Sequence, residues 1–169
     1  MAEEPRILFC GLRNAGKTTI VSRIKDDKWI SDHPATLTPK YERAEIENLN
    51  VFFIDMPGQE QYIEKWAEFT KGIDMVLYSI DSSDLKNLDH ARKIFVKLAS
   101  TDEIRNKKIP MVVVANKSDL LDKEKENELI EQWLEDPETR KFTEGIVPVS
   151  AKTGDNIPQL LMIIFSILA

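Results

Sequence analysis

The chain has 169 residues, of which 42% are hydrophobic and 31% charged, a composition typical of one globular domain with a buried core. Its formal net charge of −6 argues against nucleic acid as the main partner and against attraction to an anionic membrane, because both require a basic surface. Cys10 is the single cysteine, which excludes an internal disulfide and favours a reducing compartment. We expect residues 1–169 to form one cytoplasmic domain.

The sequence contains no targeting or anchoring signal that we can identify. Residues 1–5 provide neither the basic nor the apolar region of a signal peptide. Ala2 does not permit N-myristoylation, and a chain ending in Ala169 does not permit prenylation. No apolar run approaches the roughly 18 residues that span a bilayer. We therefore expect no intrinsic lipid anchor, and any membrane contact to be peripheral and mediated by a partner.

Apolar runs typical of strands alternate with segments of helical periodicity along nearly the whole chain. Strands are predicted at 6–10, 41–47, 49–55, 74–80, 110–115 and 146–149, and helices at 17–27, 84–100, 124–135 and 156–168. Asn48 marks a tight turn, so residues 41–55 are predicted to form an antiparallel hairpin. The nearly continuous apolar runs at 75–80 and 111–115 suit central parallel strands covered by helices on both faces. The predicted fold is a doubly wound α/β sheet of six strands, mostly parallel, with one antiparallel edge strand.

Residues 11–18 match the phosphate-binding pattern Gly-x4-Gly-Lys-[Ser/Thr] between a predicted strand and a predicted helix. A glycine-bounded loop that opens a helix directs backbone N–H groups at an anion. We expect Lys17 to reach the terminal phosphates and the Thr18 hydroxyl to hold Mg²⁺. The loop residues expected to contact nucleotide are Asn14, Ala15, Gly16, Lys17, Thr18 and Thr19.

A second motif, residues 55–60, directly follows the predicted strand at 49–55. An aspartate at the end of a buried strand beside a phosphate-binding loop can hold Mg²⁺, so Asp55 is a candidate metal-site residue. Gly58 has no side chain to keep its N–H from a γ-phosphate, and Gln59 is placed to orient an attacking water. The alternative interpretation is a plain Pro-Gly turn preceded by an aspartate.

A third motif, Asn116-Lys-Ser-Asp119, follows the predicted strand at 110–115. The Asp119 carboxylate can accept hydrogen bonds from N1 and N2 of guanine, whereas adenine has neither donor. Asn116 is expected to brace the surrounding loops, and the aliphatic stem of Lys117 to lie against the base. A fourth segment, Ser150-Ala151-Lys152, follows the last predicted strand, and the N–H of Ala151 could contact guanine O6.

In order and spacing these four motifs resemble those of the Ras-superfamily small GTPases, over essentially the whole chain. The resemblance implies a P-loop NTPase small G domain with about five helices around a six-stranded sheet. It implies a monomeric switch that binds GTP and GDP with Mg²⁺ and hydrolyses GTP slowly with help from an activating protein. Lys17 and Gln59 would be its catalytic residues, and exchange factors, activators and effectors would bind through residues 30–70.

Within that superfamily the chain is most similar to the Arf/Sar branch. The short interval from residue 36 to Asp55, the loop Gly-Leu-x-Asn-Ala-Gly-Lys-Thr-Thr and Trp66 all favour this branch. The resemblance implies a switch threonine that contacts Mg²⁺ and the γ-phosphate, for which Thr36 and Thr38 are candidates. Spacing favours Thr36. The tryptophans Trp29, Trp66 and Trp133 are predicted to pack in the core or at its rim.

Two departures from the Arf pattern leave other functions open. Arg13 stands where Arf proteins carry an acidic residue, and Pro57 replaces the usual Gly or Ala before Gly58; both positions have features similar to the Rag GTPases. The alternative function is a Rag-like scaffold that binds nucleotide and recruits partners without appreciable hydrolysis. An ATP-using P-loop kinase is a third alternative, which the guanine-type motif at residues 116–119 disfavours.

Overall fold

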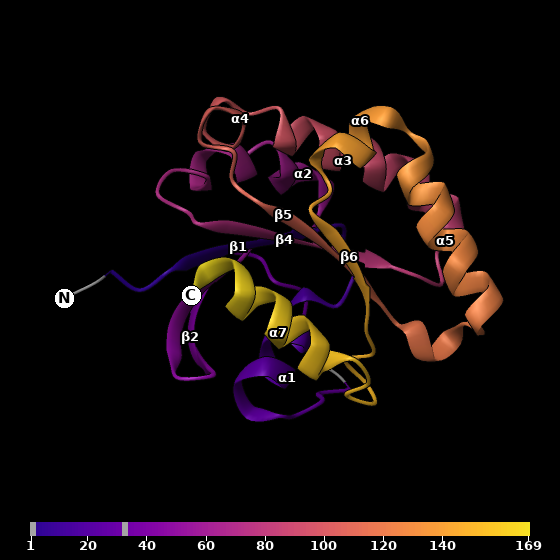
Figure 1. Cartoon of the computed structure of the whole chain (residues 1–169), viewed down its shortest axis with the longest axis horizontal. Helices are drawn as coiled ribbons and strands as arrows, with labels where there is room; N and C mark the ends of the chain where they lie inside the picture. Colours follow the sequence, from indigo (N-terminus) through magenta and orange to yellow (C-terminus); the bar gives the residue numbers. More distant parts are fainter. Residues whose placement is uncertain (1–2, 32–33) are drawn as a thin grey trace.

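A six-stranded sheet in the order β2-β3-β1-β4-β5-β6 organises the chain in the computed structural model, which describes residues 3–31 and 34–169 (Figure 1). Its strands are β1 (Arg6–Gly11), β2 (Lys40–Ile46), β3 (Leu49–Asp55), β4 (Met75–Asp81), β5 (Met111–Asn116) and β6 (Gly145–Pro148). Strand β2 pairs antiparallel with β3, and the remaining pairs are parallel. This confirms the predicted mostly parallel sheet with one antiparallel edge strand. The expectations for Ala2 and for positions 32–33 of the proposed partner-binding segment lie outside the described residues.

The hairpin between β2 and β3 follows from its turn residues. Glu47 and Asn48 have positive φ angles of 48° and 68°. Two consecutive residues of this kind form the turn whose twist matches that of paired strands, and asparagine tolerates this conformation well. The hairpin predicted from Asn48 is therefore confirmed, with β2 beginning one residue earlier than expected.

Helices cover both faces of the sheet (Figure 1). One face carries α1 (Lys17–Asp26) and α7 (Ile157–Leu168), and the other carries α2 (Glu60–Ile63), α3 (Leu88–Ala99), α4 (Asp102–Lys107), α5 (Lys123–Glu135) and α6 (Pro137–Phe142). Short 3₁₀ segments lie at Trp66–Phe69, Leu85–Asn87 and Ser118–Leu120. None of these helices in the described parts of the chain is long and apolar enough to cross a membrane.

The helix count differs from the five expected, because seven α-helices form within the described ranges. Three of them, α2, α4 and α6, have only four to six residues, too few for helical periodicity to reveal. A capping signal does exist for α6, since Asp136 accepts a hydrogen bond from the N–H of Thr139 and Pro137 occupies the first turn. The predicted helix at 84–100 starts later, at Leu88, after the 3₁₀ turn.

A buried core on each face of the sheet holds the helices in place. On the α3 and α5 side, Tyr78, Phe95 and Trp133 pack ring against ring, with centroids 5.2 Å apart for Phe95 with each of the other two. On the other side, Ile20 of α1 and Leu160 of α7 are fully buried against the sheet. Both cores fix the carboxyl ends of the parallel strands at one edge, which is where ligands bind in such sheets.

Candidate functional site

A cavity of about 690 Å³ lies at the carboxyl ends of the parallel strands. The loop after β1, the segment around Thr36, the turn after β3, the loop after β4 and Lys117 after β5 all line it. A second cavity of about 290 Å³ is lined by the turn after β3, by part of the loop after β1 and by α3. The residues that line both cavities are Arg13, Gly58, Gln59, Asp81, Asp84 and Asn87. Three of the four sequence motifs, although far apart in the chain, therefore contribute to one hollow.

The loop after β1 presents backbone N–H groups to this cavity. Helix α1 begins at Lys17 with no side-chain cap, so the backbone N–H groups at its N-terminus can bind an anionic ligand. Gly16, before the helix, has a φ of 81°, and a Cβ there would lie 2.2 Å from the Asn116 side chain. Only glycine allows the loop to approach Asn116 this closely.

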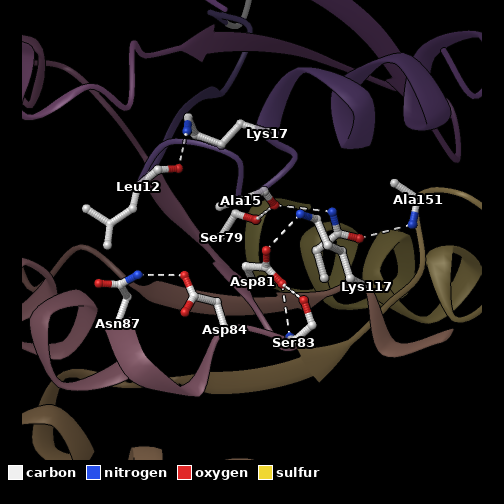
Figure 2. A network of polar contacts seen from close by, with 11 residues as sticks. Leu12, Ala15, Lys17, Ser79, Asp81, Ser83, Asp84, Asn87, Lys117 and Ala151 are labelled. Atoms are coloured by element: carbon white, nitrogen blue, oxygen red, sulfur yellow. Dashed lines mark hydrogen bonds and ion pairs between the residues drawn. The ribbon is translucent and has the colours of Figure 1, made fainter. Parts of the chain in front are cut away.

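Lys17 is buried, with 6% of its surface exposed. Its ammonium donates hydrogen bonds to the carbonyl oxygens of Gly11 at 2.8 Å and Leu12 at 3.0 Å, the second of which Figure 2 shows. Burial lowers the pKa of Lys17 from 10.5 to about 8, and the nearby Asp55 carboxylate partly opposes this shift. A phosphate group beside Lys17 would stabilise its charged form.

Oxygen atoms from three separate elements meet at the N-terminus of α1. The Thr18 hydroxyl donates to Asp55 Oδ2 at 2.5 Å and lies 2.9 Å from the Thr36 hydroxyl. Thr36 is buried whereas Thr38 is exposed, so the structure brings Thr36 and not Thr38 to this cluster. Hydroxyl and carboxylate oxygens are ligands that Mg²⁺ binds, and water and substrate phosphates usually complete its coordination. The cluster fits that ion, and no group of three or more His, Cys, Asp or Glu in the described parts of the chain could hold a metal instead.

The turn after β3 packs directly on the phosphate-binding loop. A Cβ on Gly58 would lie 2.5 Å from Lys17 Nζ and 2.7 Å from the Gly11 carbonyl oxygen. The Trp66 indole N–H donates to the carbonyl of Pro57 at 2.9 Å and holds the turn from the core side. Gln59 precedes α2 and lines both cavities, and its buried Oε1 has no hydrogen-bond partner among the residues described. This oxygen can accept a hydrogen bond from a water molecule.

Asn116 joins the phosphate-binding loop to the loop after β6. Its amide N–H donates to the Ala15 carbonyl at 3.2 Å, and its Oδ1 accepts from the N–H of Ala151 at 3.0 Å. The Ser150 hydroxyl donates to Asp119 Oδ1 at 2.8 Å and orients a carboxylate that is otherwise exposed. The exposed carboxylate of Asp119 is therefore oriented to accept hydrogen bonds from a ligand.

The N–H of Ala151 already has a partner within the protein. This N–H donates to Asn116 Oδ1, and the predicted contact with guanine O6 stays a prediction. A contact with the base therefore requires this N–H to be shared or exchanged. Because the Asn116 side chain is buried between the two loops, the competition between these acceptors was not visible in the linear motif.

Two residues that sequence analysis missed support this end of the site. Asp81, the last residue of β4, accepts from the Lys117 ammonium at 2.7 Å (Figure 2). Arg23 of α1 donates to the carbonyl oxygens of Ala151 at 2.9 Å and Lys152 at 2.7 Å. A polar residue ending an apolar strand beside the motif strands was a usable signal for Asp81. Arg23 had no comparable signal, since its partners are backbone atoms more than 100 residues away.

The prediction for the tryptophans is confirmed for Trp66 and Trp133, which are fully buried, and needs correction for Trp29. Trp29 is 43% exposed and lines the larger cavity, and the Lys152 ammonium lies 5.6 Å from the centre of its ring. Residues 29–31, which follow α1, line the cavity instead of packing into the core, and periodicity alone does not reveal this.

Comparison with known proteins identifies relatives along almost the whole chain. The model of the ADP-ribosylation factor family matches residues 1–167. ADP-ribosylation factor-like protein 6 of Danio rerio is 31% identical over 121 residues, which make up 71% of this chain and 65% of that protein. The match thus spans somewhat less than two thirds of the relative's length.

Two solved structures share the fold. The small GTPase Arl6 (BBS3) of Trypanosoma brucei, solved with the nucleotide analogue GppNp, superposes with a TM-score of 0.78 at 22% identity and covers 97% of this chain and 98% of its own. The translation elongation factor SelB of Methanococcus maripaludis, solved with the GTP analogue GppNHp, gives a TM-score of 0.75 at 21% identity and covers 98% of this chain and 34% of its own.

Proposed function

This chain belongs to the ADP-ribosylation factor family, and on that premise we propose that it is a guanine-nucleotide switch that binds GTP and GDP with Mg²⁺ and slowly hydrolyses GTP. The observation that carries the proposal is the meeting of Thr18, Thr36 and Asp55 beside Lys17. Relatives solved with GTP analogues support the choice of ligand. The proposal extends to a single, monomeric, cytoplasmic domain.

In this proposal each side chain has a defined task at the phosphates. Lys17 and the N–H groups at the start of α1 stabilise charge on the phosphate oxygens. Thr18 and Thr36 hold Mg²⁺ through their hydroxyls, and Asp55 supports it. When bound, the ion neutralises charge that develops on the β- and γ-phosphates. Gln59 orients water toward the γ-phosphate, and Asp119 selects guanine.

The switch follows from the position of Thr36. Thr36 reaches Thr18 from a segment without helix or strand, so its place depends on the group that holds both hydroxyls. A γ-phosphate and Mg²⁺ would keep the segment in, and hydrolysis would release it. Residues 30–70, as far as they are described, would then present different surfaces to exchange factors, activators and effectors in the two states.

A Rag-like scaffold without appreciable hydrolysis is the second candidate. Pro57 favours it, because proline restricts the backbone beside Gly58 and its carbonyl is held by Trp66 at 2.9 Å. A turn that is held by the phosphate-binding loop on one side and by Trp66 on the other would restrict the movement of Gln59 toward an attacking water. Arg13, which lines both cavities, also favours it, because a bulky side chain at this position would obstruct an activator's arginine.

Single-turnover hydrolysis of GTP and ATP by the wild type and by Gln59→Leu tests these functions. The switch requires GTP hydrolysis that falls about a hundredfold or more in the variant, with nucleotide affinity unchanged. Equal, negligible rates in both proteins with tight GTP binding would establish the scaffold instead. If ATP competes as well as GTP, the assignment of guanine is wrong.

A further inference from the structure

An ion pair between Asp81 and Lys117 lies at the carboxyl ends of β4 and β5, beside the base end of the cavity. Asp81 and Asn116 are register partners at the ends of β4 and β5, and Lys117 follows directly. The Lys117 ammonium donates to Asp81 Oδ2 at 2.7 Å, and both residues line the larger cavity. The Asp81 side chain keeps 18% of its surface exposed and that of Lys117 34%, so the pair is partly shielded from water.

Asp81 is itself held in one orientation. Its other carboxylate oxygen, Oδ1, accepts from the backbone N–H of Ser83 at 2.9 Å and from the Ser83 hydroxyl at 2.6 Å (Figure 2). The next residue, Ser82, donates its N–H to the Asn116 carbonyl at 3.0 Å. With Oδ1 occupied by the loop, Oδ2 is directed at Lys117. The carboxylate is therefore oriented before any ligand arrives.

Lys117 needs such a partner because its backbone alone does not fix its long side chain. Its φ of 64° turns the chain sharply at the end of β5 and places the side chain over the cavity. A free lysine samples many rotamers, and fixing it costs conformational entropy when a ligand binds. The ion pair with Asp81 restricts the side chain in advance, so that less entropy is lost on binding.

We propose that Asp81 is a positioning residue for nucleotide retention: it holds the Lys117 ammonium so that the lysine stem forms a preformed wall of the base site. The inference rests on the proposed function, since it assumes that guanine occupies this end of the cavity. It assigns Asp81 no contact with the nucleotide, and its whole effect passes through Lys117.

The test is the dissociation rate of a fluorescent GDP analogue, mant-GDP, from the full chain. Asp81→Asn removes the charge and should raise the rate about tenfold, as expected for loss of a charge-assisted hydrogen bond. Asp74→Asn is the matched control, because Asp74 flanks the opposite end of β4 and accepts from the N–H of Arg6. Its rate should stay within about twofold of wild type.

A double-mutant cycle separates positioning from a structural role. In a Lys117→Met background, Asp81→Asn should change the rate less than twofold, because the residue through which Asp81 acts is gone. A tenfold effect that persists in that background would overturn the proposal. So would an Asp81→Glu variant as impaired as Asp81→Asn, since glutamate keeps the charge. If wild type fails to bind mant-GDP at all, the proposed function fails instead.

Discussion

The two ends of the candidate site are held in different ways. At the base end, side chains from separate elements bond to backbone groups, as Asn116 does to Ala15 and Ala151 and Arg23 to Ala151 and Lys152. At the phosphate end, the hydroxyl of Thr36 contacts the hydroxyl of Thr18, the last residue of the phosphate-binding motif. The base end is assembled by the fold, whereas the phosphate end is assembled by groups that a metal ion and phosphates would also use.

The attachment of α2 to α3 strengthens this contrast. Glu60 Oε1 in α2 lies 3.1 Å from His90 Nε2. Glu64 Oε1, directly after α2, lies 2.5 Å from Lys97 Nζ. The four side chains are largely exposed to solvent. Exposed ion pairs contribute about 1 kcal/mol or less. The helix after Gln59 is therefore held weakly at its surface. A switch needs one end of its site to stay rigid while the other is released at low cost.

The largest expected effect on nucleotide affinity comes from a substitution at the base end. Asp119→Asn replaces a carboxylate that can accept from both N1 and N2 of guanine with an amide that offers a donor to one of them. We expect the affinity for GDP to fall about a thousandfold, because a buried donor of the base is left unpaired. Affinity for xanthosine diphosphate, which carries a carbonyl in place of the 2-amino group, should rise. Equilibrium titration with both nucleotides measures the exchange.

Asp122→Asn provides the control for that change, since Asp122 caps α5 by accepting from the N–H of Lys125 and asparagine caps equally well. It should leave both affinities within twofold of wild type. An Asp119→Asn protein that retained its preference for GDP would show that another group selects the base.

Gly58→Ala perturbs the phosphate end of the site. The new Cβ would lie 2.7 Å from the Gly11 carbonyl, so the turn must move away and displace Gln59. A displacement of about 1 Å costs on the order of a hundredfold in rate, and we expect single-turnover GTP hydrolysis to fall by that factor. GDP affinity should change less than threefold because the base end is untouched. Gly145→Ala, with nothing within 4 Å of its Cβ, is the matched control, and an equal loss there would contradict the steric argument.

A smaller effect comes from the titration of Lys17, whose pKa burial lowers to about 8. Phosphate binding favours the protonated lysine, so GDP affinity should be highest below pH 8 and fall up to about tenfold by pH 9. The unfolded chain binds more protons between pH 8 and 10.5, so the nucleotide-free protein should gain stability as pH rises through that window. Lys17→Arg keeps its charge throughout, and calorimetric titrations of both proteins against pH should differ. Parallel profiles would show that another group titrates.

The smallest effect concerns how Asp119 is oriented. Ser150→Ala removes the hydroxyl that donates to Asp119 Oδ1 at 2.8 Å. Loss of one such hydrogen bond costs about 1 kcal/mol, so GDP should dissociate about fivefold faster. Ser166→Ala on α7, which removes a hydroxyl bonded to the Ile163 carbonyl, controls for the change in chemistry. Equal rates for wild type and Ser150→Ala would mean that the carboxylate needs no support.

The sequence by itself determined the sheet, the longer helices and the motif-bearing loops. The central strands β4 and β5 are nearly continuous apolar runs, and the residues that follow parallel strands meet at the carboxyl ends of the sheet whatever the details of packing. The Asn48 turn was predictable for a similar reason, because its conformation depends on neighbouring residues alone. The short helices α2 and α4 were not, since tertiary contacts and not their own periodicity stabilise so few residues.

The tertiary structure alone decided which polar groups meet inside the site. Spacing favoured Thr36 over Thr38, but only the path of the segment before β2 brings Thr36 to Thr18. Arg23 and Asp81 support the base end through partners remote in sequence. The position of Asp81 at the end of an apolar strand was a signal for that residue, but nothing in the sequence predicted its pairing with Lys117 or the bonds of Arg23. Local sequence dictates local conformation, whereas a hydrogen bond between distant elements depends on how every intervening element packs.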